Sequence, residues 1–278
     1  MSVRERGVAV VLAMGAVALA AIAATAILVT QSAWARERAL IDDHAQARAL
    51  VDGALDWSRA VLADDRRTSM ADHLNEAWAV KAPAMKVERG EIAGYLEDQQ
   101  GLFNLNNLAR EGRIDPVQLA RYRRLLSVLR LPDALADALA ARLQAQLMVE
   151  VEELALVRGY DESVRAALAP FVTALPTATA VNVNTAPAEV LAAVVEKLEL
   201  SDARVLVEKR ERVYFRDVAE FSRALPSGAA ARADEVAVAS DYFRVSIRAR
   251  IGDAAARTSA LLARDGVRWP AVVWRKPS

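Results

Sequence analysis

The chain has 278 residues, and its 36 Lys and Arg are balanced by 36 Asp and Glu, so the formal net charge is zero. This balance gives no electrostatic preference for nucleic acid or for an acidic membrane surface. The sequence contains no cysteine, which excludes disulfide bonds, zinc knuckles and thiol catalysis within it.

The first predicted element is a transmembrane helix. A segment of 23 uncharged residues, from Val8 to Thr30, follows a short tail that contains Arg4 and Arg6. As a helix this segment would be about 35 Å long, enough to cross a bilayer core of roughly 30 Å. It exceeds the roughly 7–15 apolar residues of a secretory signal peptide.

The residues before this helix are typical of a prepilin leader. Gly7 stands between the charged tail and the apolar segment, which predicts a leader at residues 1–7 and cleavage between Gly7 and Val8. An uncleaved signal anchor explains the same residues and stays open at this point. Arginines flank the segment on both sides, so the positive-inside rule does not orient it. We place the tail in the cytoplasm because a short tail is more easily retained than the rest of the chain.

The helical pattern continues beyond the membrane segment. Apolar residues recur at helical spacing among charged ones, and no proline occurs between Val8 and Arg67. Gly53 is the one weak position. The sequence predicts one helix of roughly 55 residues, of which residues 31–64 pack on a globular head.

The following segments predict parts of a small sheet on either side of a helical block. Residues 65–102 are assigned to the first part of the head, with a polar connection at 65–84 and a strand at Glu91–Asp98. Residues 236–278 return to strands, expected at 243–251, 257–263 and 267–274, with a turn at Gly252 and Asp253.

The block between these strands, residues 103–235, has helical periodicity. Asp115, followed by Pro116 and Gln118, is typical of a helix start in which the Asp115 carboxylate accepts backbone N–H bonds. A further helix is expected to begin near Pro132 and Asp133. A strand before residue 100 needs a partner, which the C-terminal strands can supply. The order predicts an α+β fold: a long N-terminal transmembrane helix on a small antiparallel sheet, with a large all-helical domain inserted between strands.

The helical block contains two similar units. Phe103–Asn107 and Val181–Thr185 share the order apolar, Asn, apolar, Asn, polar, and each precedes a helix and a restart of the form Leu-x-Asp-Ala. Side-chain amides at such positions cap helix starts and satisfy backbone groups in turns. We assign this structural role to four residues: Asn104, Asn106, Asn182 and Asn184.

The second unit resembles the helix-hairpin-helix unit of competence-type DNA receptors, in which a glycine-rich hairpin brings N–H groups to a phosphate. Here the hairpin region Glu196–Leu200 has no glycine, and between Val181 and Arg223 seven Lys and Arg face eight Asp and Glu. A phosphate-binding surface normally concentrates positive charge. Nucleic acid is therefore not expected as a partner, and a membrane-anchored DNA-binding protein of this type is the alternative hypothesis.

The whole chain resembles the minor pseudopilin K family of type II secretion, also called general secretion pathway protein K. The resemblance covers most of the chain and rests on Gly7 before the apolar helix, on residues 53–57 and 76–79, on Gly90–Asn107 (GEIAGYLEDQQGLFNLNN) and on Val181–Pro187 (VNVNTAP). It implies a pilin-like head whose inserted helical domain is SAM-like or helix-hairpin-helix-like.

The resemblance also implies a function and a location. The expected protein is a single-pass minor pseudopilin of the bacterial inner membrane, with its head in the periplasm. At the tip of the pseudopilus it would form a complex with minor pseudopilins I and J and initiate assembly for export of folded proteins across the outer membrane. Its other implied partners are the remaining pseudopilins, prepilin peptidase and the inner-membrane secretion platform. Relatives can bind calcium, but no loop here has the expected ligand pattern, so we assign no metal residue and no cofactor.

One position departs from ordinary pilins. Mature pilins carry Glu at the fifth position of the apolar helix, which is Leu12 here if Val8 is the first mature residue. A carboxylate in lipid is costly unless it is paired. Pseudopilins of type K typically lack this Glu too. The resemblance implies a place at the tip of the pseudopilus, where no subunit lies above this one.

The sequence offers no candidate for catalysis. Its only histidines are His44 and His73, and it lacks the G-x-S-x-G, H-E-x-x-H and P-loop motifs. An anchored enzyme is therefore not expected.

Overall fold

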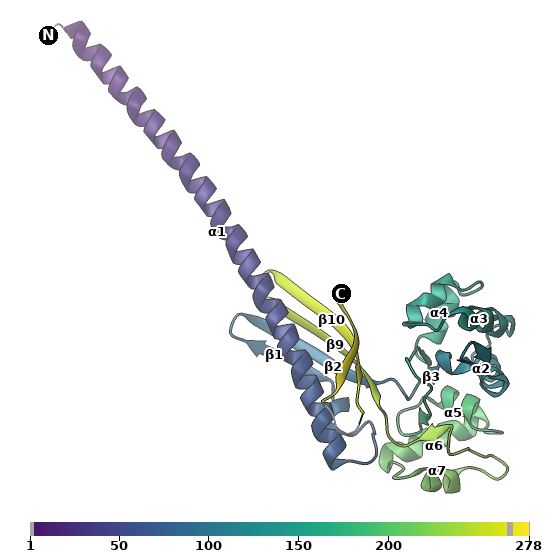
Figure 1. Ribbon diagram of the computed structural model, residues 1–278. Helices are drawn as coiled ribbons and strands as arrows, with labels where there is room; N and C mark the ends of the chain where they lie inside the picture. The colour runs from purple at the N-terminus through teal and green to yellow at the C-terminus, as the bar shows by residue number, and fades with distance from the viewer. Residues whose placement is uncertain (1–2, 266–268, 278) are drawn as a thin grey trace.

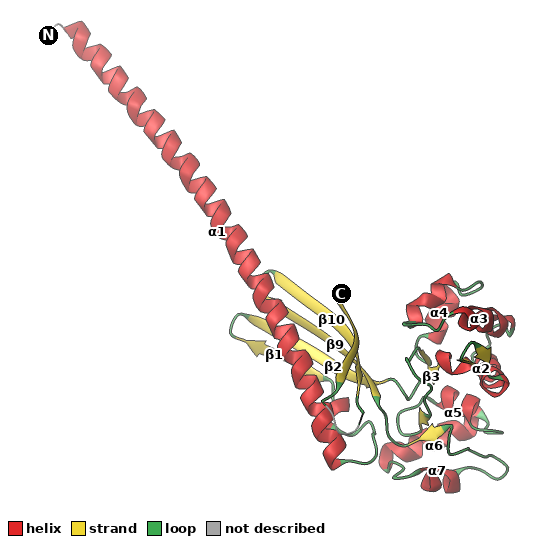
Figure 2. Cartoon of the chain, in the orientation of Figure 1, coloured by secondary structure: helices red, strands yellow, loops and turns green. Residues whose placement is uncertain are grey.

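The computed structural model describes residues 3–265 and 269–277, with side chains except those of residues 3–11 and Ala82. It consists of one very long helix, a five-stranded sheet against the distal half of that helix, and a group of short helices beyond the sheet (Figure 1). Figure 2 shows the helical and extended parts separately.

The N-terminal helix α1 spans Val3–Thr68, 66 residues without interruption. At 1.5 Å per residue it is about 100 Å long. Every described side chain from Leu12 to Asp42 is exposed, and Asp43 is the first buried one. The single helix expected from the sequence is present, but residues 31–42, which were expected to pack on the head, are exposed, and packing begins only at Asp43.

The sheet is antiparallel throughout, in the order β1-β2-β9-β10-β11. Its strands are β1 (Ala82–Val87), β2 (Gly90–Asp98), β9 (Tyr242–Ile251), β10 (Ala254–Ala263) and β11 (Ala271–Pro277). Strand β2 pairs with β9 along its whole length, from Gly90 opposite Ile251 to Asp98 opposite Phe243. The strand expected before residue 100 thus finds its partner in the C-terminal part of the chain.

Strand β1 was not predicted from the sequence. Residues 65–84 were expected to be a polar connection, but α1 continues to Thr68 and the connection covers only residues 69–81, with a short 3₁₀ helix at Ala77–Ala79. Strand β1 then starts at Ala82 and includes Pro83. A proline is tolerated there because β1 is an edge strand. Its described side chains are nearly all exposed, so the strand lacks the alternation that would reveal it.

The limits of the C-terminal strands also differ from expectation. Strand β10 begins at Ala254 rather than at Arg257, directly after the turn at Gly252 and Asp253. Strand β11 begins at Ala271, and the expected start at Val267 lies outside the described residues. The Ala-rich start of β10 has too little contrast between its two faces to show the period of two.

One hydrophobic core lies between α1 and the sheet. Val51, Leu55 and Leu62 of α1 pack against the inner face of the strands and against Trp78. The rings of Trp78 and Phe243 meet edge to face, with centroids 5.1 Å apart. This core holds the distal half of α1 in place, whereas the proximal half contributes nothing to it.

The chain between β2 and β9 forms the helical insertion, which has its own core. Its helices are α2 (Pro116–Val128), α3 (Ala134–Ala145), α4 (Glu162–Leu168), α5 (Ala188–Val194), α6 (Leu200–Arg212) and α7 (Val218–Ala224), with 3₁₀ helices at Leu105–Leu108 and Val151–Leu156. Two short strands, β4 (Ala109–Arg110) and β5 (Arg113–Ile114), pair just before α2.

Two pairs of short parallel strands divide the insertion into units. In the first unit β3 (Phe103–Asn104) pairs with β6 (Val172–Thr173), and in the second β7 (Val181–Asn182) pairs with β8 (Val236–Ala237). In each unit the strand that carries the first Asn of the repeated pattern is thus joined to the strand that closes the unit. The two units share this plan although they contain different helices.

Candidate functional site

The apolar part of α1 has the length and composition of a membrane span, and its described side chains, from Leu12 onward, are not buried within the protein. The Leu12 side chain is 68% exposed. The backbone of Gly7 and Val8 lies in α1, but their side chains lie outside the described part of the chain. A helix that exposes this much apolar surface needs an apolar solvent or other helices around it.

A free stalk connects the membrane segment to the head. Residues 31–42 are helical and exposed, and Trp34 and Ile41 are 63% and 62% exposed. The head begins at Asp43, which pairs with Arg89 of the β1–β2 turn at 2.9 Å. Gly252 of the β9–β10 turn, at φ +52°, lies against the same carboxylate, because a Cβ there would lie 2.5 Å from Asp43 Oδ2. Both proximal turns of the sheet are therefore held at one point of α1.

Arg264 is the centre of a polar junction at the distal end of the sheet. Its side chain is 1% exposed and follows the last residue of β10. Nη2 donates to both oxygens of Asp72 at 2.6 and 2.7 Å, and Nη1 donates to Asp65 at 2.8 Å. Burial raises the pKa of Asp65 to about 6, against the opposing effect of Arg264. This arginine links the end of α1, the connection after it and the end of β10.

Asp98 is the second centre of the junction and the last residue of β2. It accepts hydrogen bonds from Ser240 Oγ at 2.6 Å, Thr185 Oγ1 at 2.5 Å and Asn182 Nδ2 at 3.0 Å, and from the backbone of Gln100 at 2.8 Å. Burial raises the pKa of this carboxyl above its usual range. Asp98 therefore fastens the second unit of the insertion to the end of the sheet.

The first Asn of each pair holds its own turn and a distant segment. Asn104 Oδ1 accepts from the backbone of Asn106 at 3.1 Å and from that of Leu175 at 3.1 Å. Asn182 Oδ1 accepts from the backbone of Asn184 at 2.9 Å, while its Nδ2 donates to Asp98. Both residues are buried, so these amides serve the fold and not an external ligand.

The second Asn of each pair bonds with both sides of its amide to one distant backbone residue. Asn106 accepts from the backbone N–H of Met148 at 3.0 Å and donates to its carbonyl at 2.8 Å. Asn184 likewise accepts from the backbone N–H of Phe215 and donates to its carbonyl, both at 2.9 Å. The two units thus share a bonding pattern as well as a strand plan.

The start of α2 rests on Asp115. Its Oδ1 accepts from the backbone N–H groups of Val117 at 2.8 Å and Gln118 at 3.2 Å, and Pro116 occupies the first helical position. At the next helix, α3, Asp133 makes no such bond and instead pairs with Arg123. Of these two expected helix starts, only the first uses its acidic side chain as a cap.

Three carboxylates at the junction are spaced like metal ligands, but their oxygen atoms already accept hydrogen bonds from the protein. Oxygen atoms of Asp65, Asp72 and Glu76 lie within 4.8 Å of one another. The first two accept from Arg264, and Glu76 Oε2 accepts from Trp78 Nε1 at 2.8 Å and from the backbone of His73 at 2.9 Å. These residues do not fit a calcium ion, because a buried arginine already bonds two of the three carboxylates.

Two N–H groups of the hairpin between α5 and α6 are bonded within the protein. Glu196 N donates to the Ala230 carbonyl at 3.0 Å, and Leu198 N donates to the Val195 carbonyl at 3.4 Å. On the other side, Arg124 donates to the carbonyls of Val195 and Leu198 at 2.9 and 2.6 Å. The N–H groups of Glu196 and Leu198 are therefore not free to bind a phosphate.

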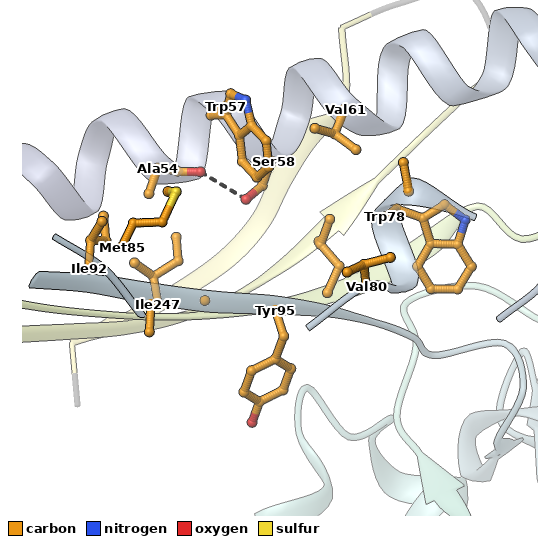
Figure 3. Close-up of a pocket in the computed structure, with 14 residues that line it drawn as sticks. Ala54, Trp57, Ser58, Val61, Trp78, Val80, Met85, Ile92, Tyr95 and Ile247 are labelled. Atoms are coloured by element: carbon orange, nitrogen blue, oxygen red, sulfur yellow. Dashed lines mark hydrogen bonds between the residues drawn. The ribbon is translucent and has the colours of Figure 1, made fainter. Parts of the chain in front are cut away.

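An apolar groove opens between α1 and the β1 edge of the sheet (Figure 3). Its cavity of about 70 Å³ is lined by apolar side chains from α1, the 3₁₀ turn and the strands, among them Trp57, Val61, Val80, Met85, Ile92 and Ile247. None of the described residues that line it carries a charge. Ser58, the hydroxyl-bearing residue on α1, donates to the Ala54 carbonyl at 2.8 Å.

The sequence analysis found the paired asparagines but missed the charged centres of the junction. The partners of Arg264 lie about 190–200 positions earlier in the chain, and Arg264 itself follows an ordinary apolar strand. No local pattern separates it from an exposed arginine. The apolar groove could not be predicted because its wall combines α1, the 3₁₀ turn, β1, β2 and β9, which meet only in the folded protein.

A membrane-length helix that continues into the wall of an antiparallel sheet, with a two-unit helical insertion, defines a membrane-anchored protein of pilin-like design. A family model described as type II secretion system (T2SS), protein K matches residues 181–245, and a second with the same description matches residues 101–147 and 140–177. The chain belongs to the family of type II secretion system protein K.

Similar proteins agree over nearly the whole chain. The type II secretion system protein K of Pseudomonas aeruginosa is 31% identical, over 90% of this chain and 86% of the relative. That of Klebsiella pneumoniae is 29% identical, over 96% and 94%. A crystal structure of the GspK-GspI-GspJ complex from the enterotoxigenic Escherichia coli type 2 secretion system has the same fold, with a TM-score of 0.73 at 23% identity, over 87% of this chain and 99% of that one.

Proposed function

We propose that this protein is a minor pseudopilin that caps and initiates the pseudopilus of type II secretion by protein contacts rather than by catalysis. The observation that carries this proposal is α1: an exposed, membrane-length apolar helix that runs unbroken into a folded head. Membership of the protein K family supports it. The head would lie in the periplasm and the helix in the inner membrane, with residues 1–7 forming a leader that prepilin peptidase removes.

The expected partners are minor pseudopilins I and J in a tip complex, followed by the other pseudopilins and the inner-membrane platform. Support comes from the similar fold in the GspK-GspI-GspJ crystal structure. Leu12 supports a place at the tip of the pseudopilus, because this residue has no carboxylate that could form an ion pair with a subunit above it. We further propose that the head (residues 43–102 and 236–278) and the insertion (103–235) are separate folding domains, without a resident cofactor.

The first test is the intact mass and N-terminal sequence of the membrane-extracted protein, with and without co-expressed prepilin peptidase. We expect the start to move from Met1 to Val8 only when the peptidase is present. The wild-type chain should also co-purify with co-expressed minor pseudopilins I and J. A start at Met1 in both preparations would show a plain signal anchor and would remove the leader from the proposal.

The competing function, membrane-anchored DNA binding, loses its main support at the hairpin. The N–H groups of Glu196 and Leu198 are bonded within the protein, and carbonyl oxygens of the same hairpin accept from Arg124. These two N–H groups are therefore not available to a phosphate.

A further inference from the structure

The apolar groove between α1 and β1 exposes large apolar side chains that the fold itself leaves uncovered. Trp57, Val80 and Met85 are 62%, 63% and 56% exposed. Figure 3 shows Met85, Ile92 and Ile247 between α1 and the sheet and Val80 farther along, next to Trp78, while Tyr95 points from β2 toward the opposite side. Contiguous exposed apolar surface of this kind, rich in Trp and Met, is typical of protein interfaces.

The shape of the groove indicates what it can take. A cavity of about 70 Å³ with uncharged walls has room for one apolar side chain, not for a whole helix. Around it, the exposed side chains provide a wider apolar rim. A partner would therefore insert one aliphatic or aromatic anchor and cover the rim with neighbouring residues, as in ordinary interfaces with a central anchor.

The position of the groove excludes two other occupants. Trp57 lies 27 residues beyond Thr30, so the groove is about 40 Å above the end of the membrane segment, out of reach of a lipid chain. The chain's own leader precedes the membrane segment and would lie on the other side of the membrane. The occupant must therefore come from another protein at that height.

A membrane-anchored neighbour meets this condition. The groove lies on the flank of the same helix that exposes its apolar surface between Leu12 and Thr30. In Figure 1 the β1 edge lies on the side of the sheet away from the helical insertion, so the approach to it is open. A subunit anchored in the same membrane, with a helix parallel to α1, would be held beside this edge at high local concentration.

We propose that the groove lined by Trp57, Val80 and Met85 is the docking site for the head of a neighbouring pseudopilin, which inserts an apolar side chain between α1 and β1. This inference rests on the proposed function, because it assigns a surface to the partners named there. It predicts that the β1 edge, and not the β11 edge, makes the contact.

The first experiment places a charge in the groove. Full-length Met85→Glu and Val80→Glu are co-expressed with minor pseudopilins I and J and purified in detergent. Both side chains are mostly exposed, so the fold should be kept, as thermal unfolding followed by circular dichroism will show. The matched control is Val273→Glu on strand β11, where the side chain is 41% exposed. We expect at least a tenfold loss of co-purified partner for the two groove variants and no loss for the control.

The second experiment uses the absence of cysteine from the chain, which makes any introduced thiol unique. Val80→Cys should crosslink to minor pseudopilin I or J with a short bifunctional reagent, and Val273→Cys should not. A crosslink only to a second copy of this chain would overturn the proposal in favour of self-association. Full co-purification by the groove variants would overturn it as well, while leaving the proposed function intact. Failure of the wild-type chain to bind I and J would instead overturn the proposed function.

Discussion

Arg264 and Asp98 are charged residues that lie almost wholly out of water, and each is surrounded by partners from distant parts of the sequence. Arg264 contacts Asp65 and Asp72, and its guanidinium lies 4.7 Å from the ring centroid of Phe243. Asp98 accepts from three side chains and one backbone group. Buried charges of this kind are tolerated only when they are paired or fully hydrogen-bonded, so the loss of one partner leaves another without compensation.

We predict that this junction makes stability depend on pH. Asp65, facing Arg264, Asp72 and Glu76, has a pKa raised by burial from 3.8 to about 6, so folding favours its protonated form. Its contribution to stability is complete below the unfolded pKa and is lost as the pH rises through about 6. The raised pKa of Asp98 acts in the same direction. The melting temperature should therefore fall between about pH 5 and about pH 7.5.

Asp65→Asn should flatten this dependence, because Asn resembles the protonated acid. Asp64→Asn is the control, since Asp64 is the neighbouring residue of α1 and its side chain is 69% exposed. Melting curves of the three proteins at both pH values test the prediction. An unchanged slope in Asp65→Asn would assign the pH dependence to other groups.

At the scale of the elements, the sequence predicted those whose pattern is local. The uncharged run of α1, the alternation in β2 and β9, and the Asp115–Pro116 start of α2 all appear in the structure. Strand β1 could not be predicted because it is an edge strand with a proline and little burial. The arginine junction could not be predicted because its partners meet only through the tertiary fold.

Two glycines should respond to substitution in opposite ways. A Cβ at Gly90 would lie 1.8 Å from the Arg250 carbonyl oxygen of the paired strand, so Gly90→Ala must displace β2 from β9 and should cost on the order of 3 kcal/mol. At Gly53, within α1, a Cβ would meet nothing within 4 Å. Gly53→Ala should stabilise the protein by about 0.5–1 kcal/mol, because alanine loses less backbone entropy in a helix.

Urea unfolding followed by tryptophan fluorescence measures both effects, and each variant serves as the control of the other. Equal destabilisation by the two substitutions would show that Gly53 has a close neighbour in the folded protein, contrary to the structure.

At the scale of the whole molecule, the free half of α1 and the head are structurally separate. The described side chains from Leu12 to Asp42 are exposed, and the core under the sheet uses α1 only from Leu50 onward. The membrane segment therefore has an apolar surface suited to lipid, but it makes no contact with the head. This separation agrees with the length and composition of the segment, which are those of a membrane span.

A chain that starts at residue 31 should therefore be soluble, monomeric and folded. We expect its melting temperature to lie within a few degrees of that of the full-length protein in detergent, because no buried contact is removed. Size-exclusion chromatography and circular dichroism test this. A fragment that aggregates or melts much earlier would show that the membrane segment supports the head after all.

The adjacency of the insertion's two ends has a consequence for the order of folding. Gln99 N donates to the Tyr242 carbonyl at 2.9 Å, so the chain leaves the sheet and re-enters it at neighbouring positions. While the intervening roughly 140 residues are disordered, closing that loop costs on the order of 4 kcal/mol. Once the insertion has folded, its ends already lie together, and β2 meets β9 as if across a short hairpin. Collapse of the insertion should therefore come first, and the sheet should close on it as a late, fast step.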